Sequence, residues 1–168
     1  MAETRANPDT ARLEMDVDAW HALASTGARV AVTVTPKGSS MRPLIVGGRD
    51  SVLIYPISGP LRKGDIVLFR RKDGANVLHR VWKLDDKSVT TFGDGCARPD
   101  APISHDQVWG VATELYRKGR TYRLDTAASR FQGRLWRIIR PVLHFPRAAA
   151  HKVIREWLGI TKKTKQKG

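Results

Sequence analysis

Cysteine is almost missing from this chain: Cys96 is the one cysteine among 168 residues. A single chain therefore cannot form an internal disulfide, and this favours a reducing compartment. The five histidines also lack the short spacings to one another or to the cysteine that hold zinc. We therefore expect neither a metal site nor a bound cofactor.

Long hydrophobic runs are missing as well. A helix that spans a membrane needs roughly 18 or more apolar residues, whereas the most apolar run, at 30–34, has the length of a strand. Residues 1–8 are polar and lack the apolar segment of a secretory signal peptide. These features predict a cytoplasmic protein, held at most peripherally at the inner membrane surface.

Acidic residues are scarce in the C-terminal third. The net charge is +14, and residues 119–168 account for most of it, with 13 Lys and Arg against 2 Asp and Glu. A basic surface of this kind attracts phosphate, whether on anionic lipid or on nucleic acid. Charge runs are often only a solvated surface, so both interpretations stay open at this point.

Short apolar segments separated by turn residues occupy residues 14–125. After a short helix over Asp16–Ser25 that Gly27 ends, alternation predicts a strand over 29–35. Further strands are predicted at Ser51–Pro56, Asp65–Arg70, Asn76–Leu84, Ser88–Phe92, Gln107–Arg117 and Thr121–Leu124, the last after a hairpin turn at 118–120. This spacing is typical of a mainly β fold, either a sandwich or a partly open barrel.

The periodicity becomes helical after residue 126. Apolar residues recur at helical spacing in Ala127–Ile139 and Arg147–Leu158, arginines occupy the other faces, and Pro141 and Pro146 separate the two segments. We expect two basic amphipathic helices over 126–160, a flexible segment over 1–13 and a disordered lysine-rich tail over 161–168. The apolar faces either pack on the β-rich domain or contact an anionic membrane.

Three residue types needed for an activated serine follow one another in the β-rich part. Ser40 stands in a turn that Gly38 precedes, His79 lies in a predicted strand, and Asp94 and Asp100 come later. A serine hydroxyl becomes a nucleophile when a base takes its proton, and a carboxylate orients that base. Either aspartate suits this role, and the backbone N–H of Ser40 is a natural oxyanion donor.

The order of the surrounding motifs adds a family resemblance. Gly38 to Pro43, Lys63 to Val67, His79-Arg80-Val81, and Gly93-Asp94 with Asp100 follow in sequence. The set resembles the type I signal peptidase superfamily, which includes the autoproteolytic repressors, over about residues 29–117. The resemblance implies a signal peptidase-like fold and a cofactor-free serine endopeptidase that removes a leader or pro-peptide after small residues. Its substrate would lie against Gly38, Ser39, Met41 and Pro43.

The base distinguishes subgroups of that superfamily. Most bacterial signal peptidases and the repressors have lysine at this position. A histidine here, His79, resembles instead the endoplasmic-reticulum and archaeal members, which use Ser, His and Asp. The family's late acidic residue maps onto Asp100 and its Gly-Asp aspartate onto Asp94. Residues 95–99 depart from the usual Asn-rich segment, so both carboxylates remain candidates. The six-residue offset between them favours Asp100 as the residue that orients His79, with Asp94 supporting the local loop. Gly38 replaces a serine of the bacterial oxyanion hole, which would leave backbone donors alone.

Two partner classes follow from these features. A peptide or precursor substrate would bind extended, along a strand edge near Ser51–Pro56 or along the segment before Ser40. The alternative is an inactive peptidase-fold module that binds peptide, nucleic acid or anionic membrane through the basic C-terminal region. Residues 1–28 are too few for the DNA-binding domain of a repressor, which makes nucleic acid the less favoured partner. The sequence does not indicate an oligomeric state.

Overall fold

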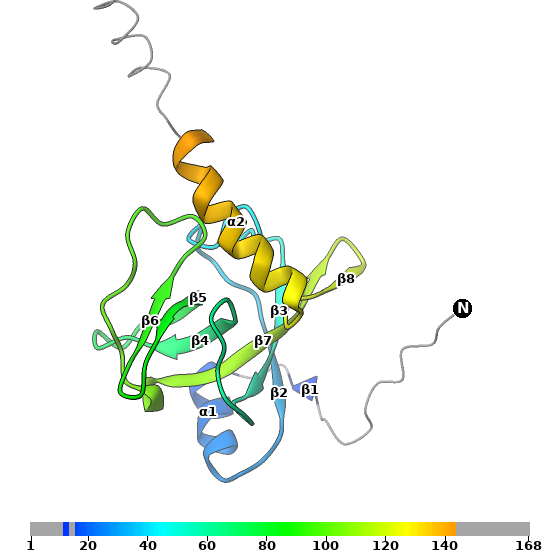
Figure 1. The fold of residues 1–168 in the computed structure, drawn as a ribbon. Helices are drawn as coiled ribbons and strands as arrows, with labels where there is room; N and C mark the ends of the chain where they lie inside the picture. Colours follow the sequence, from blue (N-terminus) through cyan, green and yellow to red (C-terminus); the bar gives the residue numbers. More distant parts are fainter. Residues whose placement is uncertain (1–11, 14–15, 144–168) are drawn as a thin grey trace, which may run out of the picture. The chain divides into compact units, whose positions relative to one another are not determined.

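The computed structural model of the protein describes residues 12–13 and 16–143. The chain divides into two compact units, 1–134 and 135–168. The first unit holds the β-sheet and the first helix (Figure 1). Of the second unit, the structure describes 135–143, which form the last part of the second helix.

The first unit is built on one β-sheet, so the predicted mainly β fold is confirmed. Its strands are β1 (Arg12–Leu13), β2 (Ala31–Val34), β3 (Ser51–Pro56), β4 (Ile66–Arg70), β5 (Asn76–Leu84), β6 (Val89–Phe92), β7 (Val108–Arg117) and β8 (Arg120–Arg123). They lie in the order β1-β2-β3-β7-β4-β5-β6, with β8 paired to β7. Seven strands are antiparallel, and β1 adds a short parallel pairing that the pattern did not indicate. Among the described residues the sheet does not close into a barrel.

Turn chemistry explains why the strand limits match the pattern so closely. β3 and β5 begin and end at the predicted residues, and the other strands shift by at most two residues. The hairpin between β7 and β8 turns through Lys118 and Gly119, which have φ angles of 48° and 74°. Positive φ at two successive residues matches the right-handed twist of the flanking strands.

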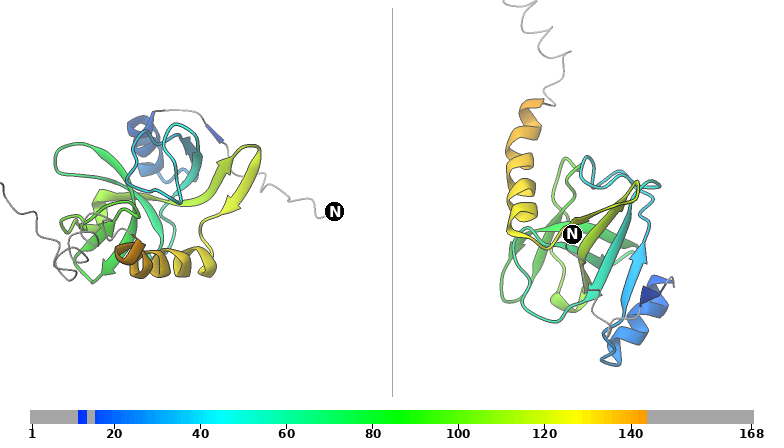
Figure 2. Two further views of the ribbon diagram at one scale, coloured as in Figure 1. Left: turned by 90° about the horizontal axis from the view of Figure 1, so that it is seen from above. Right: turned by 90° about the vertical axis from the view of Figure 1, so that its right-hand side faces the viewer.

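The first helix, α1 (Val17–Ser25), also forms where the sequence predicts it. The Asp16 carboxylate accepts a hydrogen bond from the Asp18 N–H, and Gly27 adopts the left-handed conformation just after the helix. Trp20 is fully buried, and its indole N–H donates to the Val30 carbonyl at 2.7 Å. This bond ties α1 to the residue just before β2, and the helix lies beside that strand (Figure 2).

The second helix, α2 (Ala127–Leu143), is longer than expected. The predicted end before Pro141 is wrong, because the helix continues to Leu143. Proline inside a helix removes one backbone hydrogen bond and crowds the preceding turn, which can bend a helix without ending it. The predicted helix at 147–158 and the tail at 161–168 lie outside the described residues, as does most of the segment 1–13.

Apolar side chains fill both faces of the central strands. On β4, Ile66 and Leu68 join a cluster with Trp20, while Val67 and Phe69 join a second cluster on the other face. Since successive side chains of a strand point to opposite faces, β4 is buried on both sides. Strands β4 and β5 therefore form a fixed platform, and β5 carries His79 opposite Val67.

Candidate active site

His79 and Asp100 form a hydrogen-bonded pair. His79 lies on β5 and is 5% exposed, and its Nδ1 is 2.7 Å from Oδ2 of Asp100 in the loop after β6. Thr91 on β6 donates its hydroxyl to the same carboxylate oxygen at 2.6 Å. The Asp100 N–H also donates to the Thr91 carbonyl at 2.9 Å. Strand β6 thus holds the carboxylate in position for the imidazole.

The environment of Asp100 favours its ionised form. Burial acts to raise the pKa of Asp100, but hydrogen bonds from His79 and Thr91 outweigh it and bring the pKa below its ordinary value. An ionised carboxylate only accepts hydrogen bonds, so Nδ1 of His79 must carry the proton. When the ring is neutral, the other ring nitrogen, Nε2, therefore carries no proton and can act as a base.

Nε2 of His79 is buried and makes no hydrogen bond to any described residue. It lies against Gly93, where a Cβ would come within 2.8 Å of Nε2, 2.7 Å of Cys96 Sγ and 2.6 Å of the Ser40 carbonyl oxygen. The close approach of His79, Cys96 and Ser40 to this point of the backbone therefore requires glycine at position 93. Gly93 brings the segment of the candidate nucleophile and the candidate base to the same small space.

Ser40 is half-buried in the turn that follows β2. Its carbonyl accepts a hydrogen bond from the Gly95 N–H at 2.6 Å, so the loop after β6 clamps the serine backbone. The Ser40 hydroxyl does not bond to Nε2 of His79. Nucleophile and base often meet closely only when a substrate is bound.

A cavity of about 210 Å³ opens beside Ser40. Its lining is mainly apolar and comes from α1, β2, the Ser40 turn, β4 and β5: Val17, Val34, Pro36, Lys37, Gly38, Ser40, Met41, Ile45, Leu68, Asn76, Val77 and Leu78. Two of the residues predicted to contact substrate, Gly38 and Met41, belong to this lining. The other two, Ser39 and Pro43, are exposed and lie outside it.

The second candidate carboxylate, Asp94, is paired with Arg80. Nε and Nη2 of Arg80 donate to its two oxygens at 3.0 and 2.9 Å, and both side chains are buried. Nη1 of Arg80 donates to the Gly64 carbonyl at 2.8 Å. Asp94 therefore neutralises a buried guanidinium, whereas Asp100 is hydrogen-bonded to Nδ1 of His79.

A buried ion pair fixes the loop that follows Ser40. Asp50 is fully buried and accepts hydrogen bonds from Arg49, from Arg117 on β7 and from the Val46 N–H. Arg117 also donates to the Leu44 carbonyl. The sequence pattern did not indicate this cluster, the Thr91 contact or the Arg80–Asp94 pair, because each depends on pairing between distant strands and loops.

One predicted substrate edge is wrong. Strand β3, at Ser51–Pro56, pairs with β2 on one side and β7 on the other, so its backbone groups are already used. The segment just before Ser40 has no strand pairing in the described structure and keeps this role as a prediction.

Among the described residues, no group of three or more His, Cys, Asp or Glu side chains converges as a metal-binding cluster. In the same part of the chain, neither helix has the length and apolar character needed to cross a bilayer. No family model matches the sequence, and no curated protein matches it either.

Proposed function

We propose that the protein is a serine endopeptidase with Ser40 as nucleophile, His79 as general base and Asp100 as the carboxylate that orients it. The proposal rests on the hydrogen bonding and burial of His79. Its Nδ1 is held by an ionised carboxylate, and its Nε2 is buried, unpartnered and adjacent to the Ser40 segment. This is the arrangement that a base needs to accept a proton from a neighbouring hydroxyl.

The reaction would proceed through an acyl-enzyme. The Ser40 hydroxyl attacks the scissile carbonyl while Nε2 of His79 takes its proton, and the same proton then passes to the leaving amine. Water, deprotonated by His79, hydrolyses the ester and returns Ser40. Asp100 stabilises the imidazolium in both steps. Backbone N–H groups, including that of Ser40, would bind the oxyanion, because Gly38 offers no side-chain hydroxyl.

The cavity beside Ser40 supports binding of an apolar side chain next to the scissile bond, because its lining is mainly apolar and its volume is about 210 Å³. The preference for small residues rests on the motif resemblance. The motif order and the antiparallel sheet support a peptidase of the signal peptidase type, acting on a leader or precursor peptide. We place this activity in the cytoplasm, with the substrate extended along the segment before Ser40.

A library of mixed peptides analysed by mass spectrometry tests the proposal. Wild-type protein should cleave a subset of peptides after small residues. The Ser40→Ala substitution should lower the rate of this cleavage by several orders of magnitude. Ser25→Ala is the matched control, because Ser25 ends α1 and lies outside the cavity lining. Circular dichroism of both variants verifies that the fold is intact.

A serine-reactive fluorophosphonate gives an independent readout. Intact mass should show one adduct on the wild-type protein and on Ser25→Ala, and none on Ser40→Ala. Equal cleavage by Ser40→Ala would overturn the assignment of the nucleophile. A folded wild-type protein that gives neither cleavage nor adduct would instead indicate a peptidase fold without catalytic activity.

A further inference from the structure

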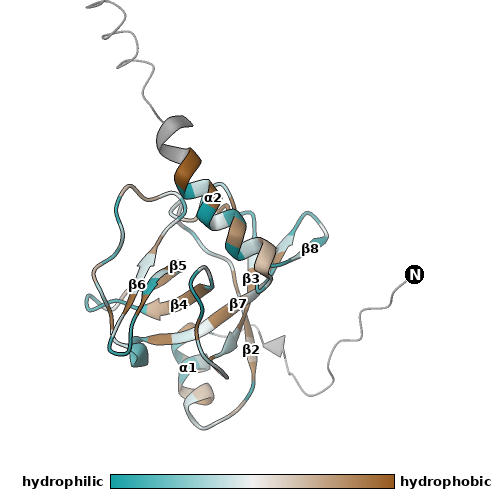
Figure 3. Cartoon of the chain, in the orientation of Figure 1, coloured by the Kyte–Doolittle hydropathy of each residue, from teal (hydrophilic) through white to brown (hydrophobic). Residues whose placement is uncertain are grey.

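Helix α2 exposes an apolar stripe. Phe131 is 64% exposed, Leu135 43%, Ile138 69% and Ile139 38%. These residues recur at intervals of three and four, so their side chains share one side of the helix. The only other exposed large hydrophobic residues in the described part of the chain are Ile57 and Tyr122. Apolar exposure in that part is therefore concentrated on α2, where Figure 3 shows hydrophobic and hydrophilic residues interleaved.

The opposite side of the same helix makes the contacts. Ser129 and Gly133 are buried, and Nη1 of Arg80 lies 3.3 Å from the Ser129 carbonyl. Residues two apart on an α-helix differ by about 200° in direction, so Phe131 points away from the side that Ser129 presents. The interpretation that the apolar face packs on the β-rich domain is therefore wrong for Phe131. Within the part of the chain that the structure describes, most of the Phe131 side chain is left uncovered.

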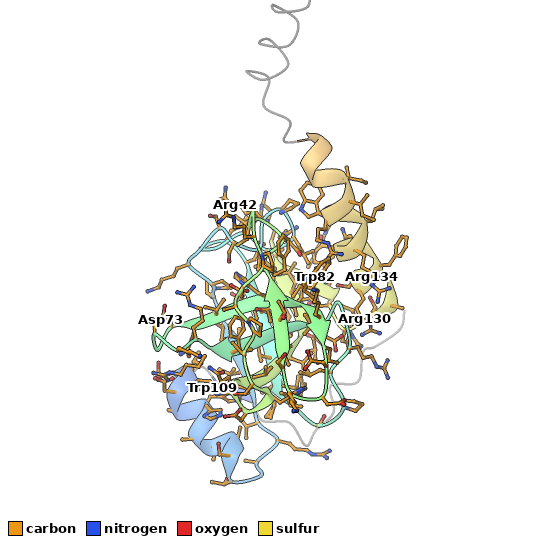
Figure 4. All side chains as sticks on the ribbon, turned by 60° about the vertical axis from the view of Figure 1, so that its left-hand side comes forward. Arg42, Asp73, Trp82, Trp109, Arg130 and Arg134 are labelled. Carbon is orange, nitrogen blue, oxygen red and sulfur yellow. The ribbon has the colours of Figure 1, made fainter. Side chains whose placement is uncertain are left out.

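Basic side chains border the stripe. Arg130 is bound to Asp65 at 3.0 Å, whereas Arg134, one turn further, is exposed (both labelled in Figure 4). The sequence from 119 to 168 has a balance of +11. A binding surface for this region must therefore accept exposed apolar side chains and also supply negative charge.

We propose that α2 docks on an anionic lipid surface, with its apolar stripe at the boundary between headgroups and acyl chains and its arginines among acidic headgroups. A membrane interface offers both environments at once, and helices with strong polar and apolar faces bind there in plane. Nucleic acid supplies phosphate, and its bases can stack on Phe131, but it offers no apolar medium for Leu135, Ile138 and Ile139. This inference concerns a separate surface and does not depend on the peptidase activity.

Co-sedimentation with lipid vesicles tests the docking. The full-length protein should bind vesicles of phosphatidylglycerol and phosphatidylcholine, should not bind phosphatidylcholine alone, and should bind less as salt rises. Ile138→Ser should weaken binding roughly tenfold, since a side chain of this size contributes strongly when it is buried. Ile57→Ser is the matched control: it makes the same substitution at an exposed isoleucine outside α2, and it should bind like the wild type.

Each alternative outcome contradicts the proposal in a recognisable way. Failure to sediment with acidic vesicles at low salt, or equal binding by Ile138→Ser and Ile57→Ser, would overturn it. Binding that a nucleic-acid competitor abolishes, with no preference for acidic lipid, would replace it with a nucleic-acid surface. Ser40→Ala should bind vesicles like the wild type, so failure of the docking and failure of the peptidase proposal are distinguishable.

Discussion

At the scale of single residues, the two candidate carboxylates have separate structural roles, and this separates the effects of mutating them. Asp100 contacts His79 and is held by Thr91, whereas Asp94 contacts the buried Arg80. An amide at 100 can no longer fix the tautomer of His79, while an amide at 94 leaves a buried guanidinium without its counter-ion. The first change should act on catalysis and the second on stability.

Asp100→Asn should lower kcat by about 10⁴, the order seen when a catalytic aspartate is replaced in this way. Asp94→Asn should lower the free energy of unfolding, by up to about 3–5 kcal/mol if the pair behaves like other buried ion pairs. Urea unfolding and peptide cleavage, measured on both variants, separate these effects. A large loss of kcat in a fully stable Asp94→Asn would transfer the orienting role to Asp94.

Two glycines of the site differ in how much space surrounds them. At Gly93, a Cβ would meet Ser40, Cys96 and His79 at less than 3 Å, whereas at Gly38 no other atom lies within 4 Å. Gly93→Ala should therefore destabilise the fold by about 1–3 kcal/mol and reduce cleavage by displacing His79 or the Ser40 backbone.

Gly38→Ala is the matched substitution, and it should change stability by less than about 0.5 kcal/mol. Thermal unfolding of the two variants provides the comparison. A Gly93→Ala protein with unchanged melting temperature and cleavage would show that the loop after β6 adapts freely, contrary to the close contacts around Gly93.

At the scale of elements, α2 is held through its backbone and its small residues. A Cβ on Gly133 would lie 2.3 Å from Nε of Arg80, and Arg80 cannot easily move because Asp94 and the Gly64 carbonyl hold it. Gly→Ala normally stabilises a helix by up to about 1 kcal/mol. At Gly133 the steric clash with Arg80 should outweigh the gain in helix propensity, because it pushes α2 away from the buried Arg80–Asp94 pair.

Gly133→Ala is therefore expected to lower the melting temperature, against the direction of helix propensity. Gln132→Ala, at an exposed neighbouring position of α2, should leave it unchanged or slightly higher. Differential scanning calorimetry measures both. A rise for Gly133→Ala would mean that the contact between α2 and Arg80 contributes nothing to stability.

The elements also show which features the sequence could predict. Strands β3 and β5 were predictable because alternation and turn residues are local signals. The order of Ser40, His79 and Asp100 was likewise visible, and the six-residue offset from Asp94 favoured Asp100, but the sequence did not exclude Asp94. That choice depends on the pairing of β5 with β6 and on the path of the loop at 93–100. The course of α2 beyond Pro141 and the direction of its apolar side also depend on packing, since periodicity does not show which face is covered.

At the scale of the whole molecule, acid stability should depend on Asp50. Burial acts to raise the pKa of Asp50, but hydrogen bonds from Arg49 and Arg117 outweigh it and bring the pKa far below its usual range. A carboxylate whose pKa is depressed by folding stabilises the protein above its unfolded pKa of about 4. This stabilisation is lost as the pH falls through the lower folded value.

Asp50→Asn should therefore have a lower melting temperature than the wild type at pH 7, and the difference should shrink as the pH falls below about 4. Asp86→Asn, which changes an exposed carboxylate, should follow the wild-type curve. Melting curves between pH 7 and pH 2.5 test this. A difference that stays constant over that range would show that the charge of Asp50 does not contribute.

Arg80 occupies the position next to His79 on β5, and its guanidinium also reaches the Ser129 carbonyl of α2. One side chain thus joins the strand of the candidate base to the helix that we propose to meet lipid. If docking shifts the equilibrium of that contact, the two sites are thermodynamically linked. Linkage of this kind is reciprocal: a peptide held beside Ser40 must then change the affinity for the membrane by the same factor by which the membrane changes the affinity for the peptide.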